Sequence, residues 1–104
     1  MNIIIKKSID LTPALEEYLQ KKFSALEKLV TAINKTNPAE LTIEVGRTTN
    51  HHRKGDVYRA AAKLHLARVT LRAEEEAESI RIAIDAAKDT LREEIEKYKD
   101  KSLR

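Results

Sequence analysis

The residues best suited to chemistry lie in one polar stretch near the middle of the chain. His51 and His52 are followed directly by Arg53 and Lys54. Imidazole and guanidinium groups can stack on unpaired bases or bind phosphates. Adjacent histidines could instead bind a divalent metal ion, but the two cations would repel it, and neighbours in an extended loop point in different directions. The stretch favours contact with RNA, and a solvated loop is the alternative.

A second set of basic residues recurs at helical spacing. It consists of Arg81, Lys88, Arg92 and Lys99. At about 100° per residue these side chains share one stripe of a helix. Asp85 and Asp89 lie close by, so ordinary ion pairs along the helix are a strong alternative to a binding surface. Lys22 borders the apolar stripe of an earlier helix, where its stem could lie along the seam between two helices.

The chain lacks the residues that most enzyme classes need. It has no cysteine and two glycines, so neither a thiolate site nor a glycine-rich phosphate loop can be built. No serine lies in a nucleophile-elbow motif. A metal-dependent hydrolase that uses His51, His52 and His65 is kept as an alternative from another functional class. We predict no catalytic residue, metal, cofactor or small-molecule substrate.

Composition limits the protein to one small domain with a modest positive charge. Its 104 residues suit a single core, built from aliphatic side chains because only 4% of residues are aromatic. The 20 Lys and Arg against 17 Asp and Glu favour a polyanion only if the cations gather on one surface. No apolar run approaches the roughly 20 residues that span a bilayer, and the opening residues 1–7 are too short and in the wrong order for a signal peptide, whose positive charges precede its apolar stretch. We therefore expect a cytoplasmic protein without a membrane partner.

Hydrophobic periodicity predicts the elements that would position these residues. Four strands are predicted, at 3–5, 41–46, 58–66 and 69–74. Thr12-Pro13 predicts the start of a helix that runs to Ile33, and a second helix is predicted from Ala77 to Tyr98. The order β-α-β-β-β-α is α+β, with two helices on one face of a four-stranded sheet and the other face exposed. Residues 99–104 form a charged tail that we expect to fray.

Four segments give the chain a resemblance to a known family. They are residues 11–15 with Lys21-Lys22-Phe23, residues 51–60, residues 71–74, and residues 83–85 with 97–99. In their order and spacing, the chain resembles the short ribosome hibernation promoting factors and the ribosome-associated translation inhibitor. These are also called sigma-54 modulation or ribosomal subunit interface proteins. The resemblance implies a single domain over residues 1–104, similar in shape to double-stranded RNA-binding domains and without the C-terminal dimerisation domain of longer members.

The resemblance also implies a function. The chain would bind the small ribosomal subunit and its rRNA in the channel for messenger and transfer RNA, and would inhibit translation by steric occupancy during stress or stationary phase. A monomer is expected, which either inactivates single ribosomes or assists another factor in pairing them. The alternative is a generic double-stranded RNA-binding module.

Carried over position by position, the family's RNA-contacting cations fall on six residues of this chain. They are Lys7, Lys22, Lys28, Arg92, Lys97 and Lys99, with the loop at 51–54 as a further candidate. The chain departs from the family pattern at Thr90, Glu93 and Glu94, which remove positive charge from the second helix. The stripe of Arg81, Lys88 and Arg92 could compensate for this loss.

Overall fold

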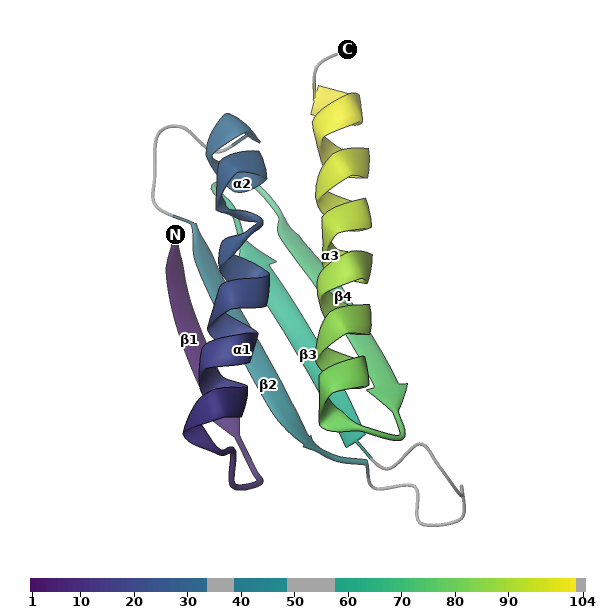
Figure 1. The fold of residues 1–104 in the computed structure, drawn as a ribbon. Coiled ribbons are helices and arrows are strands. Elements are labelled where there is room, and N and C mark those ends of the chain that lie inside the picture. The colour runs from purple at the N-terminus through teal and green to yellow at the C-terminus, as the bar shows by residue number, and fades with distance from the viewer. Residues whose placement is uncertain (34–38, 49–57, 103–104) are drawn as a thin grey trace.

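The computed structural model describes residues 1–33, 39–48 and 58–102, and its fold is the predicted α+β arrangement. The strands are β1 (Asn2–Lys7), β2 (Glu40–Arg47), β3 (Tyr58–His65) and β4 (Thr70–Ala77). The helices are α1 (Pro13–Ser24), α2 (Glu27–Ile33) and α3 (Ile80–Ser102). All three helices cover the same face of the sheet, as Figure 1 shows. In the described part of the chain, no helix combines the length and apolar content needed to cross a membrane.

The four strands form one sheet in the order β1-β2-β3-β4. β1 pairs with β2 in parallel, and the other two pairs are antiparallel. Parallel neighbours need a crossover connection, which α1 and α2 provide. The register aligns Leu41, Leu64 and Leu71 across three strands, and all three side chains are buried under the helices.

The core lies between this sheet face and the helices and is almost entirely aliphatic, as the composition predicted. Phe23 of α1, Ile43 of β2 and Ile84 of α3 are fully buried in one continuous cluster. Burial of a side chain of this size contributes about 1.5–3 kcal/mol relative to exposure. Packing against the sheet therefore holds α1 and α3 side by side. The uncovered sheet face carries exposed cations such as Lys63 and Arg72, as expected.

The predicted first helix is divided into two. Thr12 caps α1 as predicted, and its hydroxyl accepts a hydrogen bond from the Leu15 amide at 3.2 Å. A tight turn follows the helix, in which the Leu26 amide donates to the Phe23 carbonyl at 3.0 Å. α2 then continues the apolar stripe with the buried side chain of Val30. The prediction of one uninterrupted helix was wrong because a short turn can preserve the three- and four-residue spacing of apolar side chains.

The start and the end of the last helix also differ from the prediction. Ala77 is the final residue of β4, where it pairs with Tyr58, and so does not begin a helix. α3 begins later, and the Ser79 hydroxyl accepts a hydrogen bond from the Ile82 amide at 3.2 Å, which is typical of a helix cap. At the other end, α3 continues to Ser102, beyond the predicted end at Tyr98, while 103–104 lie outside the described residues.

Candidate nucleic-acid interface

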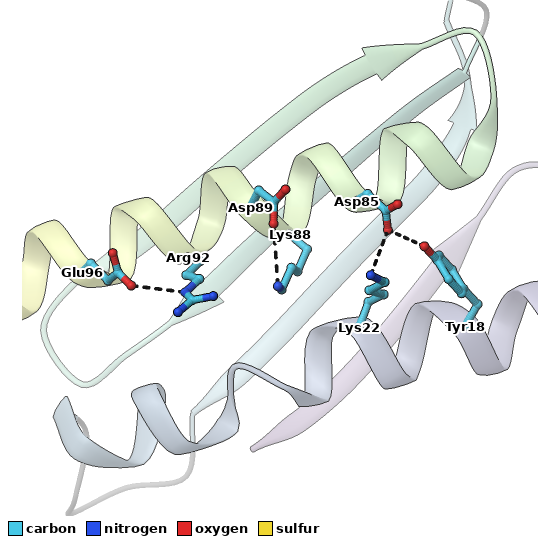
Figure 2. A network of polar contacts seen from close by, with 7 residues as sticks. All are labelled: Tyr18, Lys22, Asp85, Lys88, Asp89, Arg92 and Glu96. Atoms are coloured by element: carbon cyan, nitrogen blue, oxygen red, sulfur yellow. Dashed lines mark hydrogen bonds and ion pairs between the residues drawn. The ribbon is translucent and has the colours of Figure 1, made fainter.

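Predicted basic residues of the two long helices meet at the seam between α1 and α3. Lys22 of α1 faces Asp85 of α3, with its Nζ 3.7 Å from Oδ1 of the carboxylate. Lys88 and Arg92 follow along α3 and point toward the same seam, as Figure 2 shows. The structure therefore brings Lys22, Lys88 and Arg92 together, which the helical spacing and the position of Lys22 beside its apolar stripe had predicted.

Tyr18 of α1 joins the two helices at one end of this seam. Its hydroxyl donates a hydrogen bond to Oδ1 of Asp85 at 2.6 Å (Figure 2). Lys22 Nζ lies 5.5 Å and the Arg81 guanidinium 4.5 Å from the centroid of its ring. At such distances a cation is attracted to the face of an aromatic ring. Tyr18 thus positions Lys22 and Arg81 beside each other. The sequence prediction missed Tyr18, although its place four residues before Lys22 puts it on the same flank of α1.

The contact with Asp85 also alters the acidity of the tyrosine. The pKa of Tyr18 is raised above its ordinary value, first because the hydroxyl donates to Asp85 and then because of desolvation and the carboxylate charge. Lys22 and Arg81 act in the opposite direction. The hydrogen bond to Asp85 is therefore the main cause of the raised pKa of Tyr18, and it ties α1 to α3.

We expect the substitution Asp85→Asn to lower the pKa of Tyr18 toward its ordinary value, because the carboxylate charge is lost and the bond weakens. A raised pKa stabilises the folded protein fully below the pKa of the unfolded chain, and this contribution is lost as the pH rises through the folded pKa. The measurement is a pH titration of tyrosinate absorbance, with Tyr18→Phe variants to identify the signal. If Tyr18 titrates identically in the unmodified protein and in the Asp85→Asn variant, Asp85 is not the cause of the raised pKa.

Carboxylates are interleaved with the cations of the seam. Lys88 Nζ lies 3.6 Å from Asp89 Oδ1, and Arg92 Nε lies 3.2 Å from Glu96 Oε1. The Arg92 side chain is 54% exposed. Exposed ion pairs of this kind contribute at most about 1 kcal/mol. Arg92 can therefore exchange its carboxylate for a phosphate at small cost, so the ion pairs and a binding surface are compatible uses of the same side chains.

Other predicted cations lie away from the seam. Lys7 is on the edge strand β1, across the sheet from α3 (Figure 1), and it forms an ion pair with Glu16. Lys97 lies roughly 140° around α3 from Arg92 and pairs with Glu94 at 3.8 Å. The family correspondence at these positions therefore does not place Lys7 and Lys97 with the other cations.

The remaining predicted residues divide into two groups. Lys28 is exposed on α2, and Lys99 continues the stripe of α3, two turns beyond Arg92. Four others, His51, His52, Arg53 and Lys54, lie outside the described residues.

The departures from the family pattern fall largely outside the seam. Thr90 and Glu94 each lie roughly 160° around α3 from Arg92, on the opposite side of the helix. Glu93 is exposed and lies roughly 100° away from Arg92. These residues therefore lower the charge of α3 without placing a carboxylate between Lys22 and Arg92.

The third predicted histidine is on the uncovered sheet face. His65 Nδ1 lies 3.0 Å from the Thr70 hydroxyl on the neighbouring strand. Within the described ranges, no three His, Asp or Glu side chains gather in a way that could hold a metal ion. The arrangement of His65 gives no support to the metal-dependent hydrolase.

The comparisons with known proteins agree with this fold. The model of the family described as sigma 54 modulation protein / S30EA ribosomal protein matches residues 3–102. The crystal structure of the Thermus thermophilus Protein Y N-terminal domain is 22% identical, with a TM-score of 0.70, over 94% of this chain and 99% of that one. A ribosomal subunit interface protein from Coxiella burnetii is 21% identical, with a TM-score of 0.71, over 96% and 99% of the two chains. At these identities the structural likeness supports the fold. A search of curated proteins gives no significant match.

Proposed function

The chain belongs to the sigma 54 modulation protein / S30EA ribosomal protein family, and from that premise we propose that it binds the small ribosomal subunit and blocks its messenger and transfer RNA channel. The membership confirms the resemblance inferred from the sequence. The family is ribosome-associated, and the proposal adds the subunit, the channel and the inhibition of translation in stress or stationary phase. A ribosomal partner would also place the protein in the cytoplasm.

The observation that carries the proposal is the convergence of Lys22, Arg81, Lys88 and Arg92 along one seam. The stripe from Arg81 to Lys99 extends about 27 Å along α3, which is long enough to follow several phosphates of one backbone. Phosphate contacts from Lys and Arg position a protein on nucleic acid without reading its sequence. A rigid pair of helices with cations at fixed spacing therefore suits a folded rRNA surface.

A protein that inhibits translation by occupying the RNA channel must keep its shape, and it needs to catalyse no reaction. The seam is held by the Tyr18–Asp85 bond and by the buried core beneath it, so its cations stay in place before RNA binds. Such preorganisation reduces the entropy lost on binding. In this proposal one copy of the protein acts on one small subunit, without a catalytic residue, a metal or a cofactor.

Salt should weaken this binding steeply. Each neutralised phosphate contributes about −0.7 to −0.9 to the slope of log K against log salt concentration, so four seam cations predict a slope of about −3 to −4. The slope can be measured from binding isotherms of labelled protein on purified small subunits between low and moderate salt. A response independent of salt would exclude a surface that binds phosphates.

Sedimentation tests the proposed partner. The protein is mixed with purified small subunits, large subunits and intact ribosomes and is run through a sucrose gradient, where it should travel with the fractions that contain small subunits. An equal mass of free RNA duplex is then added. If an equal mass of duplex displaces the protein, the alternative of a generic double-stranded RNA-binding module is correct and ribosome specificity is wrong.

A further inference from the structure

Asp85 is a carboxylate that lies within the seam itself. Its described side-chain contacts cross to α1, whereas Asp89 and Glu96 form ion pairs with cations of their own helix. A carboxylate at this position repels the phosphates that the neighbouring cations attract. A neutral amide could also accept the hydrogen bond from Tyr18, so the tie between the helices does not by itself require a charge. Phosphate binding and the tie together leave the charge of Asp85 unexplained.

One oxygen of Asp85 remains open to a ligand. The hydrogen bond from Tyr18 and the ion pair with Lys22 both end on Oδ1, as Figure 2 shows. Within the part of the chain that the structure describes, no side-chain hydrogen bond or ion pair ends on Oδ2, and the side chain is 43% exposed. An ionised carboxylate accepts hydrogen bonds on both oxygens. Oδ2 can therefore accept from an N–H group of a ligand while Oδ1 keeps the two helices joined.

Arg81 provides a flat surface beside this acceptor. Its guanidinium lies 4.5 Å from the centroid of the Tyr18 ring, which supports one side of the cation. Arg81 is exposed, and no carboxylate in the described ranges forms an ion pair with it. Arginine planes stack on unpaired bases of RNA. Because side chains four residues apart on a helix have Cβ atoms about 5–6 Å apart, a base stacked on Arg81 can bring its edge to Asp85.

We propose that Arg81 and Asp85 bind one unpaired RNA base that carries an exocyclic amino group. The base stacks on the outer side of the Arg81 guanidinium and donates an amino N–H to Oδ2 of Asp85. Cytosine, adenine and guanine have such a group. Uracil has none, and its ring N–H lies between two carbonyl oxygens that the carboxylate repels. RNA as the partner rests on the proposed function, which this base contact deepens.

The base contact and the phosphate contacts have different roles. Phosphate contacts by Lys88 and Arg92 hold the protein on the RNA backbone, and a base contact at one end of the stripe fixes its register. Bases in an A-form duplex are paired and stacked, so they cannot occupy a site that requires an unpaired base. The pair of Arg81 and Asp85 therefore favours a folded RNA with unpaired nucleotides, such as rRNA, over a plain duplex.

The first test compares two single-stranded hexanucleotides of equal charge, oligo(C) and oligo(U), by fluorescence anisotropy with the full chain at low salt. We expect oligo(C) to bind about fivefold more tightly, as one additional hydrogen bond provides. Asp85→Ala should remove this preference. Arg81→Lys keeps the charge but removes the flat surface, and it should weaken both oligonucleotides about threefold. Equal affinities of the unmodified protein for the two oligonucleotides would overturn the site.

Two matched variants separate the base contact from effects on helix packing and on charge. Tyr18→Phe removes the hydrogen bond between the helices but keeps the ring and the Asp85 carboxylate, so the preference for oligo(C) should remain. Asp89→Ala removes the same charge about one turn further along α3 and should also leave the ratio of the two affinities unchanged. Loss of the preference in Tyr18→Phe would mean that Asp85 acts only by joining the helices, and loss in Asp89→Ala would mean that only net charge matters. Either result rejects the base contact.

Binding to small ribosomal subunits gives a result whose sign distinguishes the two proposals. Asp85→Ala removes a negative charge, yet it should weaken binding about fivefold because the base contact is lost. Asp89→Ala removes the same charge and should not weaken binding. If Asp85→Ala binds the subunits more tightly, the seam contacts phosphates alone, so the base contact is wrong and the proposed function stands. If the unmodified protein prefers oligo(C) but does not bind small subunits, the proposed function fails and the base site remains.

Discussion

Charge reversal of Lys22 and Arg92 together should weaken binding to small ribosomal subunits by about 100-fold, equivalent to about 2.8 kcal/mol. The two side chains approach the seam from different helices, so the double variant replaces attraction by repulsion on both sides of a bound backbone. The affinity can be measured by pelleting labelled protein with subunits at fixed salt. Folding should be nearly unaffected, because both side chains are substantially exposed, at 40% and 54%.

Two further double variants test whether the loss of affinity depends on the position of the charges at the seam or only on the net charge of the protein. Lys63→Glu with Arg72→Glu makes the same change in net charge on the opposite sheet face, and we expect it to leave affinity within about twofold. Lys22→Gln with Arg92→Gln removes the cations without adding repulsion and should weaken binding by about tenfold, or about 1.4 kcal/mol. A large fall in melting temperature for the reversed pair would show that the two residues support the fold instead of binding RNA.

Ile84→Ala should reduce the free energy of unfolding by about 2–5 kcal/mol, the range for deletion of a buried isoleucine side chain. Ile84 is a residue of α3, and its side chain is fully buried in the core between this helix and the sheet. Small domains have a total stability of about 5–15 kcal/mol, so this loss is a large share of it. Urea denaturation measures the change as a lower midpoint at constant slope.

Ile82→Ala is a closely matched control because it removes the same atoms from the same helix. Ile82 is 49% exposed, so the substitution should change stability by no more than about 0.5 kcal/mol. Equal losses for the two variants would mean that the outward side of α3 is covered in solution, for example by a second molecule. Ribosome binding should be retained by Ile82→Ala, because this residue does not belong to the seam.

The sequence predicted the elements well because each strand or helix repeats a pattern within itself. Alternation at Leu41, Ile43 and Val45 identified β2, whose helix-covered side chains are buried as expected. Boundaries were less predictable. The turn at Ala25-Leu26 keeps the apolar spacing of a helix, and Ala77 suits a strand end as well as a helix start. Local periodicity does not distinguish these cases, and pairing with other parts of the chain decides them.

The candidate interface was predictable only in part, for the same reason. Residues on one helix, such as Arg81 and Arg92, share a stripe that spacing alone reveals. The contact between Tyr18 and Asp85 joins residues 67 positions apart and depends on how the helices pack. Lys7 shows the limit of the family correspondence, because its distance from the seam follows from the strand order.

The pairing of β1 with β2 alone has a consequence for how the chain is made. β1 holds three consecutive isoleucines, Ile3 to Ile5, and among the described strands its one neighbour in the sheet is Glu40–Arg47. During synthesis these isoleucines therefore emerge long before their partner strand exists. Short β-branched segments in this condition are prone to aggregate, and flanking charges oppose it. Lys6 and Lys7, directly after the isoleucines, are placed to keep this nascent segment from associating with other chains until β2 has been translated.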